Sequence, residues 1–292
     1  MPIVTIQDFT GVYAEQPFMQ SLRESAATDR HTRWLDCAQI NGTDCYCDDE
    51  AQAELNRMMD GAVAADANVP ATTTPGIHFF DNGNYHYMSK LWTDRVQELF
   101  DLVVFDHHPD MQPPRFEGIL SCGGWILEVL KSNKFVQNIV IIGVADHLVD
   151  EIREEIASHL SDTREQSLAN VHFIKESELN STDLSSLVCS EFTSVLPSNL
   201  YISIDKDALS TSEAATNWDQ GSLTYGQLAD TLTALAENRK ILGIDICGER
   251  ARDMGFEDTA AADALNNALN EKLYKLVTAL VEKEAAPGAA GH

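Results

Sequence analysis

The chain has 292 residues, of which 46 are Asp or Glu and 20 are Lys or Arg, giving a formal charge of −26 at pH 7. This charge repels nucleic-acid phosphates and anionic membrane surfaces, so we expect neither as a partner. Apolar residues make up 44% of the chain, which indicates a folded globule rather than an acidic disordered chain.

The amino-terminal sequence does not resemble an export signal, because residues 1–5 carry no basic side chain and Asp8 follows soon after. No apolar run approaches the roughly 20 residues of a membrane span. We therefore expect a cytoplasmic protein whose six cysteines are reduced thiols. Cys45 and Cys47 are too close together for a typical zinc knuckle, which favours a structural role for them.

The first 75 residues have the least regular pattern. Residues 4–6 predict a short strand, and residues 48–59 predict a helix with Ala51 and Leu55 on one side. Residues 64–75 are rich in Ala, Thr and Pro, which is typical of a loop.

From residue 76 onward, short apolar runs alternate with helical patterns. The runs are continuous, as expected of strands buried on both faces, and lie at 77–80, 102–105, 139–142, 171–174, 200–204 and 241–246. Helical spacing occurs at 91–99, 148–160, 224–237 and 259–283, and Thr224 with Gln227 forms a capping-box pattern. This alternation predicts one α/β domain over residues 1–283, with a mostly parallel sheet between two helical layers and a disordered tail at 284–292.

Polar side chains follow three of the predicted strands. The run at 102–105 leads into Asp-His-His-Pro-Asp, in which alternation places Asp106, His108 and Asp110 on one side. The carboxyl ends of parallel strands meet at one edge of the sheet, where functional groups collect.

Two further strands bring similar groups to the same edge. The run at 200–204 leads into Asp-Lys-Asp, which places Asp205 and Asp207 together and points Lys206 away. The run at 77–80 leads to His86.

Four carboxylates and two imidazoles do not crowd together without positive charge, and no Lys or Arg cluster accompanies them. Two divalent cations would supply that charge, and oxygen with imidazole ligands suits Mn²⁺, Fe²⁺ or Zn²⁺. The sequence therefore predicts a metal site with two ions.

These motifs resemble the ureohydrolase superfamily of arginases and agmatinases. The family signature is a Gly-Gly-Asp-His turn, then Asp-Ala-His-x-Asp, then Ser-x-Asp-x-Asp. This chain has Gly-Asn-Tyr-His at 83–86, Asp-His-His-Pro-Asp at 106–110 and Ser-Ile-Asp-Lys-Asp at 203–207. Gly-Ser-Leu-Thr-Tyr at 221–225 and Leu-Gly-Ile-Asp-Ile at 242–246 are also similar to family segments.

The resemblance covers about residues 76–283 and implies an arginase-like fold with a dinuclear manganese centre. The six ligands that it implies are His86, Asp106, His108, Asp110, Asp205 and Asp207. Asp106 and Asp205 would bridge the ions. His86 and Asp110 would complete one site, and His108 and Asp207 would complete the other. A hydroxide held between the ions would attack a guanidinium carbon, expel an amine and release urea.

The departures from the family pattern concern the substrate. Tyr85 stands where the family has Asp, and Glu249 lies one residue later than the acid that grips the guanidinium. Cys-Gly-Gly at 122–124 occupies the stretch of the proton-shuttling His, for which His147 is the nearest replacement. Leu148 matches the Asp that binds the α-amino group of arginine.

We therefore expect a metal-dependent hydrolase of a guanidino or amidino compound other than free L-arginine, with Asp110, His147 and Glu249 as catalytic candidates. The partner is a small molecule, and the resemblance implies a homo-oligomer. A deacetylase-like amidohydrolase and a non-catalytic, metal-stabilised binding protein are the alternatives.

Overall fold

The computed structural model describes residues 1–64, 76–114, 116, 118–159, 170–179, 184–190, 199–237, 239–251 and 259–285. Most of the predicted loop at 64–75 and most of the predicted tail at 284–292 lie outside these residues.

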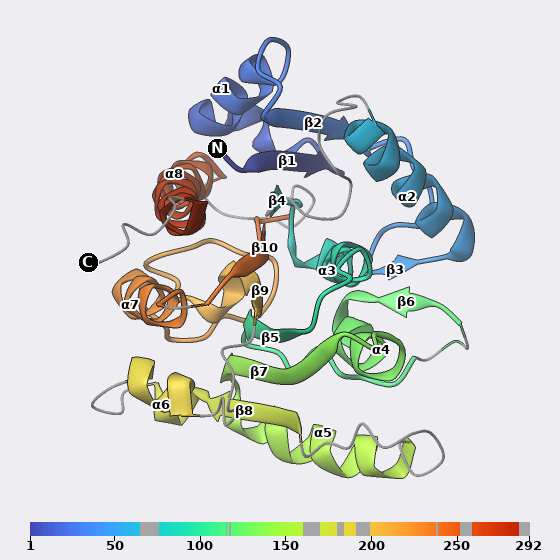
Figure 1. The fold of residues 1–292 in the computed structure, drawn as a ribbon, viewed down its shortest axis with the longest axis vertical. Helices are drawn as coiled ribbons and strands as arrows, with labels where there is room; N and C mark the ends of the chain where they lie inside the picture. The colour runs from blue at the N-terminus through green and yellow to red at the C-terminus, as the bar shows by residue number, and fades with distance from the viewer. Residues whose placement is uncertain are drawn as a thin grey trace, which may run out of the picture.

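Eight parallel strands form one sheet in the order β2-β1-β4-β10-β9-β5-β7-β8 (Figure 1). The strands are β1 (Ile3–Asp8), β2 (Thr32–Asp36), β4 (Gly76–Phe79), β5 (Phe100–Phe105), β7 (Val136–Val144), β8 (Val171–Lys175), β9 (Asn199–Asp205) and β10 (Ile241–Cys247). A small antiparallel pair joins β3 (Tyr46–Cys47) to β6 (Leu120–Ser121).

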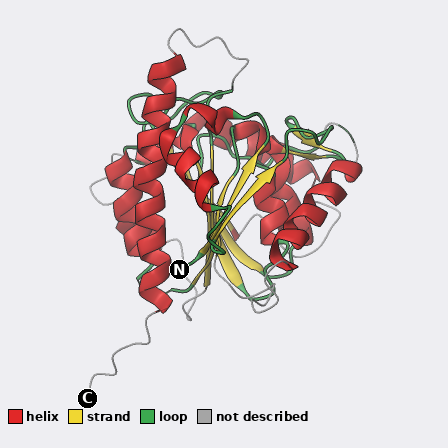
Figure 2. Cartoon of the chain, turned by 90° about the horizontal axis from the view of Figure 1, so that it is seen from above, coloured by secondary structure: helices red, strands yellow, loops and turns green. Residues whose placement is uncertain are grey.

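Helices cover both faces of the large sheet, as Figure 2 shows edge on. The helices are α1 (Pro17–Ser25), α2 (Asp49–Ala64), α3 (Met88–Thr93), α4 (Trp125–Ser132), α5 (Asp146–His159), α6 (Leu184–Ser190), α7 (Tyr225–Leu235) and α8 (Thr259–Ala285). α1, α6, α7 and α8 bury side chains in one core, and α2 to α5 bury theirs in the other. The predicted αβα layering and parallel sheet are confirmed.

Alternation along the strands divides their side chains between the two cores. On β9, for example, Ile202 enters the core under α7 and α8, whereas Tyr201 enters the core under α2 to α5. Both side chains are almost fully buried. This explains why the strands read as continuous apolar runs, since both faces of each strand are covered.

The helix predicted at 91–99 is wrong in its extent. α3 ends at Thr93, and Leu99 is 54% exposed. The Asn133 side-chain amide donates to the Thr93 carbonyl at 3.0 Å, and the chain must become extended where β5 begins at Phe100. Trp92 and Val96 still pack against the core under α2 to α5, which gives the apolar spacing without a longer helix.

The amino-terminal 64 residues contain elements that the sequence pattern did not indicate, among them α1 and β2. α1 begins with Pro17 at its first turn, where the missing N–H of proline costs nothing. β2 is an edge strand with only one fully buried residue, Thr32, so it has no continuous apolar run. The capping box at Thr224 and Gln227, in contrast, is present at the start of α7 as predicted.

Among the described residues, no helix combines the length and the apolar character needed to cross a membrane. The longest helix, α8, instead packs one face against the sheet through residues such as Leu273 and Val277. An ion pair between Arg250 and Asp263 fixes its first turns, with nitrogen–oxygen distances of 2.7 and 2.6 Å.

The close contact between β9 and β10 yields a first prediction. A Cβ at Gly243 would lie 2.5 Å from the ring of the buried Tyr201, so Gly243→Ala overpacks the core. We expect the free energy of unfolding to fall by about 1–3 kcal/mol in urea denaturation.

Gly61→Ala is the matched control, because a Cβ at this exposed helical position meets no atom within 4 Å. This change should stabilise the protein by about 0.5–1 kcal/mol. Equal effects of the two substitutions would contradict the packing that the structure shows.

Candidate metal centre

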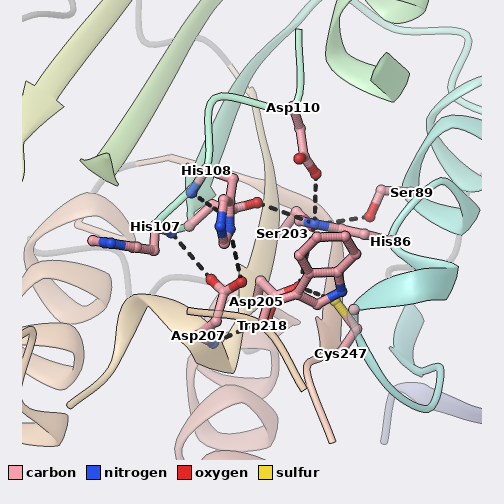
Figure 3. Close-up of polar contacts among 12 residues, drawn as sticks. His86, Ser89, His107, His108, Asp110, Ser203, Asp205, Asp207, Trp218 and Cys247 are labelled. Atoms are coloured by element: carbon pink, nitrogen blue, oxygen red, sulfur yellow. Dashed lines mark hydrogen bonds and ion pairs between the residues drawn. The ribbon is translucent and has the colours of Figure 1, made fainter. Parts of the chain in front are cut away.

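The candidate metal centre lies at the carboxyl ends of four adjacent strands, β4, β10, β9 and β5. Asp106 follows β5, and Asp205 ends β9. His86 comes from the segment after β4, directly behind a 3-10 turn at Gly83–Tyr85. All six side chains predicted as ligands meet here, as the close-up in Figure 3 shows for those that it labels.

The first cluster is centred on His86 Nδ1. This atom lies 3.1 Å from Asp106 Oδ2, 3.0 Å from Asp110 Oδ2 and 3.5 Å from Asp205 Oδ2. We call His86, Asp106, Asp110 and Asp205 the first cluster. All four residues are buried, so the protein places three carboxyl groups around one imidazole nitrogen away from bulk solvent.

The second cluster consists of Asp106, His108 and Asp207. His108 Nδ1 lies 3.0 Å from Asp207 Oδ2 and 3.5 Å from Asp106 Oδ1. Asp106 thus has one carboxylate oxygen in each cluster and joins the two clusters, while its predicted bridging of two ions stays a prediction. The bridging role predicted for Asp205 stays a prediction, since its Oδ1 accepts a hydrogen bond from the Asp207 backbone N–H at 2.9 Å.

Neighbouring groups hold the ligand side chains in place. Ser203 Oγ lies 2.9 Å from His86 Nε2, which leaves Nδ1 to face the first cluster. Trp125 Nε1 donates to Asp110 Oδ2 at 2.8 Å. Such contacts orient metal ligands and tune their basicity.

The backbone also shapes the segment from 106 to 110. Asp110 has a φ of 45°, in the left-handed region that non-glycine residues seldom adopt. The backbone N–H of His108 donates to Asp106 Oδ1 at 2.6 Å, which fixes the turn between the two ligands. His107, between them, turns away and places Nδ1 3.2 Å from the Gly143 carbonyl oxygen.

The carboxyl groups of the site are buried next to one another, and this raises the pKa of two of them. Burial and then the charge of Asp207 raise the pKa of Asp205 to about 7. Burial and then the charge of Asp106 raise the pKa of Asp207 as well. Burial alone would lower the pKa of His108, but hydrogen bonds to Asp106 and Asp207 raise it to about 12. The protein alone therefore retains protons where cations would otherwise sit.

The residues present fit divalent cations. Asp106 Oδ2 is fully buried and has no hydrogen-bond partner among the described residues, although it faces the first cluster. A buried carboxylate oxygen without a partner is costly, and a cation would supply one. The donor set of carboxylate oxygens and imidazole nitrogens suits Mn²⁺, Fe²⁺ or Zn²⁺.

The two clusters form the floor of a cavity of about 390 Å³. Its wall includes Trp218, Leu148, Tyr46, Pro109 and Gln112. None of the described residues that line it is Lys or Arg.

Trp218 is the largest side chain of this wall and is 41% exposed. Its ring centroid lies 5.7 Å from that of His108, and its Nε1 donates to Asn84 Oδ1 at 3.0 Å. Gly83 makes this placement possible, because a Cβ there would lie 2.6 Å from the indole ring.

Two other predicted site residues lie elsewhere. Glu249 is fully buried, forms an ion pair with Lys206 and accepts hydrogen bonds from Gln16 and Asn270. It is not among the described residues that line the cavity. His147 is exposed on α5 and is also absent from that lining, so the structure brings neither residue to the ligand clusters.

The rim of the cavity contains two thiols. Cys45 and Cys122 lie just outside the register of β3 and β6, and the Cys122 N–H donates to the Cys45 carbonyl at 2.9 Å. A hydrogen bond with Cys122 lowers the pKa of Cys45. Cys47, in contrast, is buried in the core under α2 to α5.

Two residues near the ligands were not predicted as part of the site. Trp125 is fully buried, and its indole N–H donates to Asp110. Cys247 was not considered, and its Sγ lies 3.2 Å from Asp205 Oδ2. The register between β9 and β10, which pairs Cys247 with Asp205, places this thiol at the site, and the sequence pattern does not contain that register.

Comparisons with known proteins place this geometry in context. The sequence model of the arginase family matches residues 19–269. An uncharacterized protein of Thermotoga maritima is 27% identical over 248 residues, which are 85% of this chain and 80% of that protein.

Solved structures with this fold include three with related names. An arginase from Bacillus caldovelox has a TM-score of 0.54 at 16% identity, covering 92% of this chain and 98% of its own. An agmatine ureohydrolase of Thermoplasma volcanium has a TM-score of 0.58 at 15% identity, covering 97% of this chain and 90% of its own. A Trypanosoma cruzi formiminoglutamase with Mn²⁺ has a TM-score of 0.56 at 12% identity, covering 92% of each chain.

The raised pKa of Asp205 predicts how metal and pH act together on stability. Because the folded pKa, about 7, lies above the ordinary value of 3.8, the folded state binds this proton more tightly than the unfolded state does. That stabilisation is present below the unfolded pKa and is lost as pH rises through about 7. The melting temperature of the metal-free protein should therefore fall between about pH 5 and about pH 8, and the increase caused by added Mn²⁺ should grow.

Asp205→Asn separates this effect from general pH effects, since the amide carries no charge at either pH. The metal-free variant should lose less stability over the same range than the wild type, and it should retain fewer metal ions. Asp150→Asn, at a side chain that is 74% exposed, should behave as the wild type does. Identical pH profiles for wild type and Asp205→Asn would contradict the electrostatic description of the site.

Proposed function

The chain belongs to the arginase family, and we propose that it is a dinuclear-metal hydrolase that cleaves a linear C–N bond of a guanidino or amidino compound. The observation that carries the proposal is the convergence of two His/Asp clusters, joined by Asp106, on the floor of one cavity. When bound, a pair of divalent cations would supply a hydroxide nucleophile near neutral pH. Mn²⁺ is the ion we propose, with Fe²⁺ or Zn²⁺ as alternatives.

The protein's own residues would bind and orient the substrate. Carboxylates on the cavity floor favour a cationic guanidinium or amidinium group over an anion. The indole of Trp218 lines the cavity beside His108, and a planar cation can stack on such a ring. Asp110, held by Trp125 and lining the cavity, is the group that we propose to carry a proton toward the leaving amine.

The wall of the cavity argues against free L-arginine as the substrate. An α-carboxylate needs a cationic or hydrogen-bonding partner, and the described lining contains no Lys or Arg. Leu148, which lines the wall, offers no acceptor to an α-amino group. A decarboxylated, acylated or peptide-bound guanidine fits this wall better.

Measurement of urea and of released amine tests the proposal on a substrate panel. With Mn²⁺ supplied and a guanidino acid included in the panel, we expect agmatine or an arginine-containing peptide to be hydrolysed with a kcat/KM at least about tenfold above that of free arginine, a difference of about 1.4 kcal/mol. Metal analysis of the same protein should find up to two ions per chain.

The outcomes of this panel separate the alternatives. Release of acetate from an N-acetylated amine, with no product from guanidines, would indicate a deacetylase-like enzyme. Binding of a guanidine without turnover would indicate a binding protein. Efficient hydrolysis of arginine, with the other compounds inert, would show that the pocket assignment is wrong while leaving the metal centre intact.

Replacement of Trp218 tests its proposed contact with the substrate. Trp218→Ala removes the stacking surface, and we expect KM for the best substrate to rise by roughly tenfold, since a cation–π contact contributes about 0.5–2 kcal/mol. Trp218→Phe keeps an aromatic face and should recover most of the loss. An unchanged KM in the alanine variant would exclude Trp218 from the substrate-binding wall.

A further inference from the structure

Cys247 is the only cysteine that the described residues bring into a potential ligand cluster, together with His86 and Asp205. We infer that Cys247 is a further, thiolate ligand of the ion held by the first cluster. The inference rests on the proposed metal centre and concerns which metals that centre selects.

The sheet register places the Cys247 side chain against the first cluster. Cys247 is the direct partner of Asp205 across β10 and β9, so both side chains project from the same face of the sheet. Sγ lies 3.2 Å from Asp205 Oδ2, and a ring nitrogen of His86 completes a group of potential ligand atoms that all lie within 4.8 Å of one another. Figure 3 shows Cys247 beside these residues.

The turn after β10 brings the thiol into this position. Gly248 has a φ of 88°, and a Cβ at this residue would lie 2.2 Å from Asp205 Oδ1 and 2.6 Å from the Lys206 backbone nitrogen. The strand end therefore approaches the metal ligands more closely than any side chain at 248 would allow. Glu249 turns away into its pair with Lys206, and Cys247 supplies the functional group that β10 presents to the site.

A second observation indicates a missing partner at this point. Asp106 Oδ2, in a residue that is 1% exposed, has no hydrogen-bond partner among the described residues and lies 3.1 Å from His86 Nδ1. The Cys247 side chain is likewise buried, with only the cluster as its polar surroundings among the contacts that the structure shows. His86 belongs both to the group with Asp106 and Asp110 and to the group with Asp205 and Cys247, so an ion held by His86 would have the carboxylates on one side and the thiol on the other.

The chemistry of a thiol makes the two clusters different. On binding a divalent cation, the Cys247 thiol gives up its proton to solvent, and the sulfur forms a bond to the ion. Thiolate ligands favour Zn²⁺, Fe²⁺ or Co²⁺ over Mn²⁺, whereas the second cluster offers only carboxylates and an imidazole. The first cluster should therefore select a softer ion than the second.

Cobalt titration of the full chain tests the inference without measuring activity. Co²⁺ in the first cluster should give a near-ultraviolet sulfur-to-cobalt charge-transfer band. This band should be absent from Cys247→Ser and present in Cys45→Ser, which removes a thiol from the rim of the same cavity. Competition should also show the preference for Zn²⁺ over Mn²⁺ falling by at least about tenfold in Cys247→Ser.

The possible results distinguish this inference from the proposed function. Bound cobalt with only visible absorption in the wild type would overturn the thiolate assignment and leave a centre of oxygen and nitrogen ligands. No bound cobalt, zinc or manganese would overturn both. The wild-type spectrum tests the thiolate assignment even if Cys247→Ser does not fold. A charge-transfer band that is retained in Cys247→Ala would also contradict the assignment.

Discussion

Repulsion among buried carboxylates is the constraint that governs this molecule. Asp106, Asp205 and Asp207 are each at most 2% exposed, and no lysine or arginine is among the described residues lining their cavity. The large sheet can hold them together because their backbones are fixed by strand pairing and by hydrogen bonds within the turns that carry them. The fold thus holds uncompensated negative charge in one place, and binding of divalent cations would neutralise it.

Other contacts in the site hold these carboxylates and imidazoles in fixed orientations. Side chains from distant parts of the chain aim the ligands, as Ser203 does for His86 and Trp125 does for Asp110. The α/β layers supply the rigidity, since the strands that carry these residues are buried between helices on both faces of the sheet. In the function that we propose, the wall above the clusters, which includes Trp218 and Leu148, would select the substrate.

Much of this arrangement could be predicted from the sequence, because strand alternation and the carboxyl-end rule act locally. The apolar runs located the strands, and the spacing of Asp205 and Asp207 placed both carboxylates on the site side. Glu249 and Cys247 could not be assigned in this way. A left-handed Gly248 separates them, and only the register between β9 and β10 determines which of the two side chains meets Asp205.

Lys206 connects the two proposed ligands beside it to residues packed under α8. It lies between Asp205 and Asp207, is 1% exposed, and pairs with Glu249 and Asn270 under α8. Loss of one charge would leave the other buried without its ion-pair partner and would destabilise the fold. Replacement of both residues by neutral side chains would change the stability much less. Removal of one of the two charges should therefore cost more stability than replacement of Lys206 and Glu249 together by neutral residues.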